Sequence, residues 1–167
     1  MRLRNPTSNF AYTAYTLVEI LVVLAVMAIV AGVVIPSVID TGSSQAMSAA
    51  REIMADLEYA QSTAITTQMP VTVTFNLSGD SYTLSNASGT LIHPINKTGF
   101  VVNFKTLSGF GQTDLATANF GGNAKVTFDE SGSPDYGGTL AVQAGPHIYQ
   151  VTVAAATGKI SVVSIGS

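Results

Sequence analysis

The apolar residues of this chain are concentrated in the stretch YTLVEILVVLAVMAIVAGVVIP (residues 15–36). It is apolar from residue 17 to residue 35 except for one acid, Glu19. A helix rises about 1.5 Å per residue and the hydrocarbon core of a bilayer is about 30 Å thick, so about 20 residues are needed to span it. The run is just long enough. The sequence therefore predicts a transmembrane helix with an acid near its N-terminal end.

Basic residues flank only one side of this run. Arg2 and Arg4 precede it, and the next basic residue downstream is Arg51. The positive-inside rule then predicts a cytoplasmic N-terminus and places the bulk of the chain outside the cytoplasm. A secretory signal peptide is the simplest alternative. Its apolar region is usually about 7 to 15 residues long and ends in a small-residue cleavage site, whereas this run is longer and nothing breaks cleanly after it.

Helical patterning resumes after Pro36. Apolar residues recur at spacings of three and four, and the charged residues mostly lie off this stripe. The stripe consists of Ala46, Ala50, Ile53, Leu57, Ala60 and Ala64. The pattern ends before Pro70. The sequence predicts one long helix from about residue 16 to 66, loosened at Gly32 and Pro36, whose second half is amphipathic and must pack on another element.

The remainder of the chain is rich in β-strand signals. Residues 71–75 (VTVTF) alternate and return through a turn into residues 82–86 (YTLSN), which predicts a hairpin. Turns containing glycine and proline separate the other candidates. These further strands are predicted at residues 100–105, 125–128, 139–143, 148–153 and 159–164. A long helix packed by its amphipathic half on an antiparallel sheet is an α+β fold.

Composition argues against several chemistries. The 167 residues include no cysteine, which removes disulfides, thiol catalysis and thiolate metal sites. The formal net charge is −3 and the basic residues are dispersed, whereas nucleic-acid binding needs clustered basic groups. His93 and His147 have no acid or second histidine at ligand spacing, and the acidic turn 129–135 lacks the pattern of a calcium loop. We expect no metal, no cofactor, no catalytic residue and no enzymatic activity.

The segment around the apolar run resembles the class III signal of type IV pilins and type II secretion pseudopilins. The likeness rests on a short basic leader followed by Tyr15, Thr16, Leu17, Val18 and Glu19, and on Pro36, which is in register with a proline common in that family. The resemblance implies that a prepilin peptidase cuts between Ala14 and Tyr15 and that the new amine of Tyr15 is N-methylated. It also implies that Glu19 and Pro36 act in assembly. The family normally has glycine where this chain has Ala14.

The C-terminal part is similar to the GspH/FimT branch of minor pseudopilins and minor pilins. The residues that carry this likeness are Phe128, Gly132, Pro134, Thr157, Gly158 and Lys159. The resemblance implies a minor pseudopilin, a structural subunit of a type II secretion pseudopilus. A type IV pilus minor pilin of the FimT kind, acting as an adhesin or in DNA uptake, is the alternative. We do not expect DNA binding, because Lys159 is the one basic residue in the last forty. The residues that carry the two resemblances lie outside residues 76–127, and we expect subunit-specific contacts in that segment.

The resemblance also implies the organisation and the partners of the chain. Residues 1–14 would be a prepilin leader, and residues 15–38 the transmembrane and assembly half of the helix. Residues 39–167 would be a periplasmic pilin-like domain, in which the helix continues to about residue 66. The protein would be a single-pass bacterial inner-membrane protein before assembly. Its partners would be other pilins or pseudopilins, the prepilin peptidase, the inner-membrane assembly platform and membrane lipid.

Glu19 needs a partner if it enters an apolar environment. An acid at the centre of a membrane helix costs about 2.5–3.5 kcal/mol on insertion scales, and less near the interface. After cleavage, Tyr15 would carry an amine that is positive near neutral pH. The hypothesis is that Glu19 pairs with the amine of an adjacent subunit and fixes its register. Placement of Glu19 in the headgroup region stays open. For the whole chain, a membrane-tethered binding module and a membrane-anchored enzyme also stay open.

Overall fold

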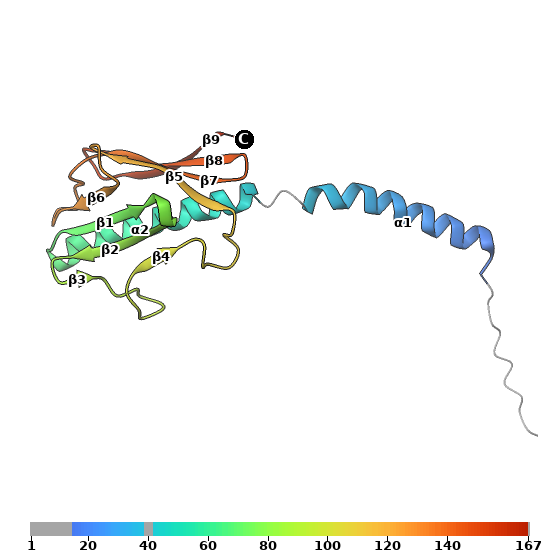
Figure 1. The fold of residues 1–167 in the computed structure, drawn as a ribbon, viewed down its shortest axis with the longest axis horizontal. Coiled ribbons are helices and arrows are strands. Elements are labelled where there is room, and N and C mark those ends of the chain that lie inside the picture. The colour runs from blue at the N-terminus through green and yellow to red at the C-terminus, as the bar shows by residue number, and fades with distance from the viewer. Residues whose placement is uncertain (1–14, 39–41, 167) are drawn as a thin grey trace, which may run out of the picture. The chain divides into compact units, whose positions relative to one another are not determined.

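The computed structural model describes residues 15–38 and 42–166. The predicted leader, residues 1–14, lies outside this described part, and so does Ala14 at the predicted cleavage point. The chain divides into two compact units, Met1–Asp40 and Thr41–Ser167. The first unit contributes one helix, and the second contains a helix together with the described strands (Figure 1).

The segment predicted as one long helix is described as two. Helix α1 spans Leu17–Val38 and helix α2 spans Gly42–Thr67, and residues 39–41 between them lie outside the described part. The helical backbone of α1 includes Gly32 and Pro36. The predicted start and end of the helical region are therefore each within about a residue of the structure.

Helix α2 is amphipathic, as its sequence spacing predicts. All six residues of the predicted stripe are fully buried, together with Ala49. The buried side is mostly alanine, which lets the helix backbone approach its neighbours closely. On the other side Arg51, Ala55 and Glu58 are exposed. The buried side of α2 contacts strands of both sheets, so the helix is the element that joins them.

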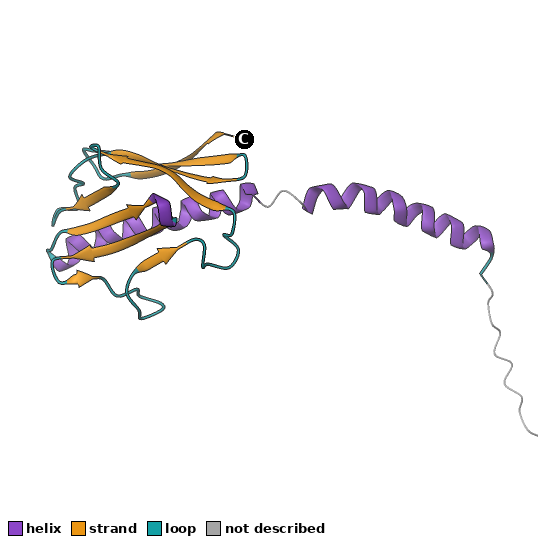
Figure 2. Ribbon diagram, viewed as in Figure 1, coloured by secondary structure: helices purple, strands orange, loops and turns teal. Residues whose placement is uncertain are grey.

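The strands form two antiparallel sheets (Figure 2). The first sheet contains β1 (Val71–Asn76), β2 (Ser81–Asn86), β3 (Gly89–Thr90), β4 (Val101–Asn103) and β6 (Lys125–Phe128). Its order is β3-β2-β1-β6, and β4 pairs with β2. The second sheet contains β5 (Thr113–Phe120), β7 (Gly138–Ala144), β8 (His147–Val153) and β9 (Ile160–Gly166), in the order β5-β7-β8-β9. The architecture is α+β, with a helix packed on antiparallel sheets.

Two strands of the structure were not predicted. The short β3 pairs with the end of β2, and β5 forms one edge of the second sheet. Strand β5 has a bulge between Leu115 and Thr117, so its buried positions do not alternate along the whole strand. The sequence of β5, TDLATANF, also has few strongly apolar residues. An alternation pattern therefore could not find it.

Aromatic rings fill the space beside the first sheet. Phe75 packs on Tyr82 and Phe120, and Tyr82 packs in turn on Phe104, with ring centroids 5.7–5.9 Å apart. All four rings are buried. Offset or tilted ring pairs at this separation are favourable. Most of these rings come from residues 76–127, so this segment contributes much of the core.

Candidate functional site

The N-terminal end of α1 is capped by Thr16. The backbone N–H of Glu19 donates to Oγ1 of Thr16 at 3.2 Å, and the N–H of Ile20 donates to the carbonyl oxygen of Thr16 at 3.2 Å. Thr followed three residues later by Glu is the spacing of a capping box, and the cap satisfies an N–H group that a helix otherwise leaves free. The same T-x-x-E spacing is part of the pilin-like signal in the sequence.

Tyr15 and Glu19 lie at this same helix end. Tyr15 is 73% exposed, and the side chain of Glu19 is also exposed. A carboxylate in the first turn interacts favourably with the partial positive charge of a helix N-terminus, by about 0.3–1 kcal/mol. Glu19 thus has a local role in α1, and its exposed carboxylate remains accessible to another chain.

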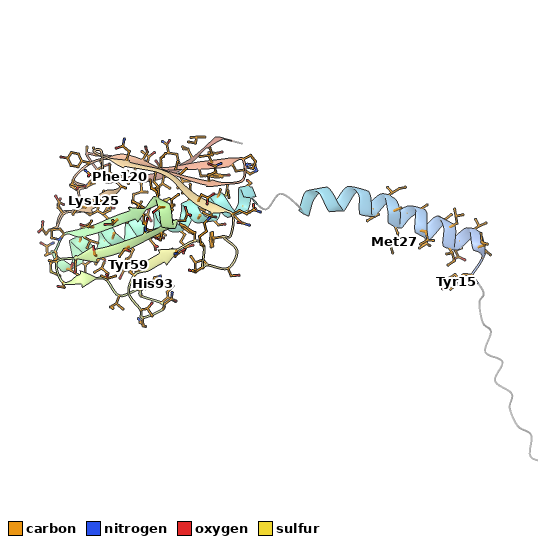
Figure 3. All side chains as sticks on the ribbon, in the orientation of Figure 1. Tyr15, Met27, Tyr59, His93, Phe120 and Lys125 are labelled. Carbon is orange, nitrogen blue, oxygen red and sulfur yellow. The ribbon has the colours of Figure 1, made fainter. Side chains whose placement is uncertain are left out.

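The described side chains of α1 expose apolar surface in every direction. Ile20, Leu21, Val22, Val23 and Leu24 are consecutive, cover more than one helical turn, and are each about half or more exposed (Figure 3). A helix that is apolar all round is typical of a segment that is buried in lipid or in a helix bundle. Within the part of the chain that the structure describes, no helix reaches the combined length and hydropathy needed to cross a bilayer.

The residues of the C-terminal resemblance come together against α2. Gln61 of α2 donates from Nε2 to the carbonyl oxygen of Gly132, at 2.7 Å. Gly158 packs on the same amide group, because a Cβ at this position would lie 2.4 Å from Gln61 Nε2. Pro134 lies beside Gly158 and forms an isolated bridge with Phe128. We call this contact between Gln61 and the two turns the α2–turn junction.

The remaining residues of the resemblance close the second turn of the junction. The N–H of Lys159 donates to Thr157 Oγ1 at 3.3 Å, and Ala154 exchanges backbone hydrogen bonds with Gly158 and Lys159. Gly132 and Gly158 both have positive φ, +81° and +63°. The residues that carry the C-terminal resemblance therefore have a structural role, because they form or support the contact that fixes two turns of the domain on α2.

A second group of polar side chains lies on another side of α2. Tyr82 donates its hydroxyl to Oδ2 of Asp56 at 2.5 Å, and Glu52 lies one helical turn before Asp56. Burial raises the pKa of Asp56 above its ordinary value of 3.8. Burial and the nearby charge of Asp56 raise the pKa of Glu52 above 4.5, whereas His93 acts in the opposite direction. Burial also raises the pKa of Tyr82, so its hydroxyl stays protonated and remains a donor.

Sequence reasoning missed this group because its members are far apart in the chain. His93 has no acid near it in the sequence, but the fold brings it close enough to influence both Glu52 and Asp56. Within the described residues, no three histidine, aspartate or glutamate side chains are arranged to hold a metal ion. The turn 129–135 binds its own backbone instead, since Asp129 Oδ1 accepts hydrogen bonds from Ser131 and Ser133.

The raised pKa values predict how stability depends on pH. Because Glu52 and Asp56 hold their protons more tightly in the folded chain, the folded state binds more protons than the unfolded state above about pH 4. Their contribution to stability is therefore greatest below the unfolded pKa values and is lost as pH rises through the folded ones. We expect thermal unfolding of Glu52→Gln to show a smaller loss of stability across this range than the wild type. Glu58→Gln, on the exposed side of α2, should behave like the wild type.

Comparison with known proteins identifies the family. The sequence profile of a family described as "Type II transport protein GspH" matches residues 49–158, about two thirds of the chain. This range includes most of α2, both sheets except the last strand, and the α2–turn junction. No curated protein sequence matches the chain.

Solved structures share the fold. Two structures of the minor pseudopilin EpsH from the type II secretion system of Vibrio cholerae align at TM-scores of 0.55 and 0.56 and 16% identity. They cover 72% and 75% of this chain and 97% of the EpsH chains. The type IV minor pilin FimU of Pseudomonas aeruginosa aligns at a TM-score of 0.51 and 19% identity, covering 72% of this chain and 89% of FimU. The fold is thus pilin-like, and with the profile match it shows that the chain belongs to the GspH family of type II transport proteins.

Proposed function

We propose that the chain is a minor pseudopilin, a structural subunit of the pseudopilus of a type II secretion system. The observation that carries the proposal is that the described side chains of α1, residues 17–30, expose apolar surface on every side, while the following domain has the GspH fold. Such a helix needs an apolar environment, since about 25 cal/mol is lost for each Å² of apolar surface left in water. A bilayer and a bundle of like helices both provide that environment. The helix would thus be an inner-membrane anchor first and part of a filament core later.

Processing is the first step of the proposed function. A prepilin peptidase would cut between Ala14 and Tyr15 and methylate the new amine, and the N-terminus would remain on the cytoplasmic side of the inner membrane. The exposure of Tyr15 and the cap at Thr16 support this, because the cut would fall just before the first helical turn. The helix would keep its N-terminal cap after cleavage.

Glu19 and Pro36 would act in assembly. The exposed carboxylate of Glu19 lies at the helix end that would carry the amine of Tyr15, so the charges of two neighbouring subunits could pair there within an apolar filament core. Pro36 lies near the C-terminal end of α1. A proline removes one helical hydrogen bond, which would allow the helix to bend or extend as the subunit leaves the membrane. The inner-membrane assembly platform would take up the processed subunit.

Processing predicts a defined mature N-terminus. Intact-mass measurement on chain purified from the membrane should give a species that begins at Tyr15 and carries one added methyl group. Deleting the prepilin peptidase should leave residues 1–14 in place. Ala14→Gly should raise the processed fraction, because the peptidase prefers the smallest residue before the cut. A mature N-terminus at about residue 32 or later would instead indicate secretory cleavage.

A type IV pilus minor pilin is the second candidate, and the fold that the chain shares with FimU favours it. The two candidates differ in the filament that the subunit enters. Purification of the tagged chain followed by identification of the associated major subunit separates them. A major pseudopilin of type II secretion is the expected partner.

A further inference from the structure

A small cavity lies beside the polar group of α2. Its volume is about 120 Å³, and it is lined by the side chains of Glu52, His93 and Asn96 and by residues 101–103 of β4. Thr106 and Leu107 complete the lining. Both His93 and Tyr59 pack on the ring of Phe100, which fixes the loop that carries His93 against α2 (Figure 3). The cavity lies wholly within the second compact unit.

Glu52 gives the cavity its acidic group, and no lysine or arginine lines it. Among the described residues the ion pairs are those of Lys105 with Asp80 and Asp114, so no lysine or arginine neutralises Glu52. His93 is held in the cavity wall by its own loop: its Nδ1 accepts hydrogen bonds from the backbone N–H groups of Ile95 at 3.1 Å and Asn96 at 3.4 Å.

Glu52 and Asp56 differ in the surroundings of their carboxylates. The carboxylate of Asp56 accepts the hydroxyl hydrogen bond of Tyr82, whereas Glu52 lines the cavity. Like charges one helical turn apart are mutually destabilising, and partial burial of Glu52 adds a desolvation cost. An added positive charge in the cavity would offset both the repulsion between Glu52 and Asp56 and the desolvation cost of Glu52.

Exposed apolar side chains lie at and beside the cavity. Val101 is 56% exposed and Leu107 is 37% exposed, and the neighbouring loop presents Ile92 and Ile95, which are 60% and 81% exposed. Exposed apolar side chains around a polar centre are typical of an interaction surface. Lysine and arginine match this arrangement, because each combines an apolar stem with a charged end.

We propose that this cavity is a docking site for a lysine or arginine side chain of a neighbouring pseudopilin subunit. The charged end would pair with Glu52, and the stem would pack on Val101 and Leu107. This inference rests on the proposed function, because the basic side chain would come from a neighbouring subunit. Cation binding by the cavity can be tested on the chain alone. The occupant follows from charge complementarity: the cavity offers the carboxylate of Glu52, which no lysine or arginine of the described residues pairs, and exposed apolar side chains beside it.

The first test uses n-butylguanidinium as the probe and its neutral analogue n-butylurea as the control. The full chain is titrated in detergent micelles and followed by ¹H–¹⁵N NMR at the amides of Ile95, Asn96 and Asn103. Saturable shifts are expected with n-butylguanidinium and not with n-butylurea. Glu52→Gln should weaken binding at least about tenfold, because one partner of a charge pair is lost. Glu58→Gln should leave it unchanged. Equal binding by Glu52→Gln, or an equal response to n-butylurea, would overturn the proposal.

The thermal stability of the same variant excludes a merely structural explanation. Glu52→Gln should fold and melt at the same temperature as the wild type or higher at neutral pH, since it removes a charge that lies near Asp56. Loss of probe binding together with lower stability would mean that Glu52 only supports the fold, and the docking role would then be wrong.

The second test asks whether the basic group comes from another subunit. Glu52→Lys should lower the amount of processed chain in isolated pseudopili at least about tenfold relative to the wild type, whereas Glu58→Lys should not. Normal incorporation of Glu52→Lys would overturn the docking role even if the probe binds. If wild-type chain itself is missing from pseudopili, the proposed function fails, and the probe titration still decides whether the cavity binds a cation.

Discussion

Glu19→Gln should leave the chain processed and membrane-bound but remove it from assembled pseudopili. In an apolar filament core, the amine of Tyr15 from the adjacent subunit would lose its counter-charge. Removing one partner of a buried ion pair costs about 3–5 kcal/mol, a factor of more than one hundred in an association constant. The measurement is the ratio of chain in sheared pseudopili to chain in the membrane, determined by quantitative immunoblotting.

Two controls make this result specific. Glu58→Gln carries the same chemical change on the exposed side of α2, outside the apolar helix, and should assemble normally. The melting temperature of the domain should not change in Glu19→Gln, because Glu19 belongs to the other compact unit. Normal incorporation of Glu19→Gln would show that Glu19 acts only within the first turn of α1 or lies in the headgroup region.

Gly158→Ala should destabilise the domain by about 2–4 kcal/mol. Its φ of +63° is unfavourable for alanine, by about 1–2 kcal/mol. In addition, the new Cβ would lie 2.4 Å from Gln61 Nε2 and 2.8 Å from the carbonyl oxygen of Gly132, so the amide must move and its hydrogen bond to Gly132 is lost. That loss adds about 1–2 kcal/mol. Urea unfolding of the full chain in detergent measures the change in the free energy of unfolding.

Gly145 provides a matched control for this substitution. It also has a φ of +60°, but a Cβ there would meet nothing within 4 Å. Gly145→Ala should therefore show the backbone penalty alone. The difference between the two variants isolates the packing of Gly158 in the α2–turn junction. Equal losses at the two positions would mean that the close packing of Gly158 on Gln61 contributes nothing to stability.

The sequence predicted the elements that have a strong period. The stripe from Ala46 to Ala64 predicted the buried side of α2, because burial on one side of a helix imposes a spacing of three to four residues. The strands with alternating apolar residues were predicted because burial of one face of a strand imposes a spacing of two residues. The division of the strands into two sheets was not predicted, because strand pairing depends on contacts between distant segments. Strand β5 was missed because its bulge between Leu115 and Thr117 breaks the alternation.

The candidate sites divide in a similar way. The signal from Tyr15 to Glu19 lies in adjacent residues, so it could be found from the sequence. The turn residues of the α2–turn junction were also found by their pattern in the sequence, but their contact with Gln61 was not predicted. The cavity at Glu52 could not be found. Its acid lies on α2 and its histidine lies in the loop before β4, and the packing of both His93 and Tyr59 of α2 on Phe100 helps to bring them together.

We propose that the chain enters the pseudopilus as a processed subunit. The most direct test is mass spectrometry of the N-terminal peptide in pseudopili purified from cells that express the chain at its natural level. We expect a peptide that begins with methylated Tyr15, present in smaller amounts than the peptide of the major pseudopilin. Absence of the chain from the pseudopili, or a different N-terminus there, would contradict this proposal.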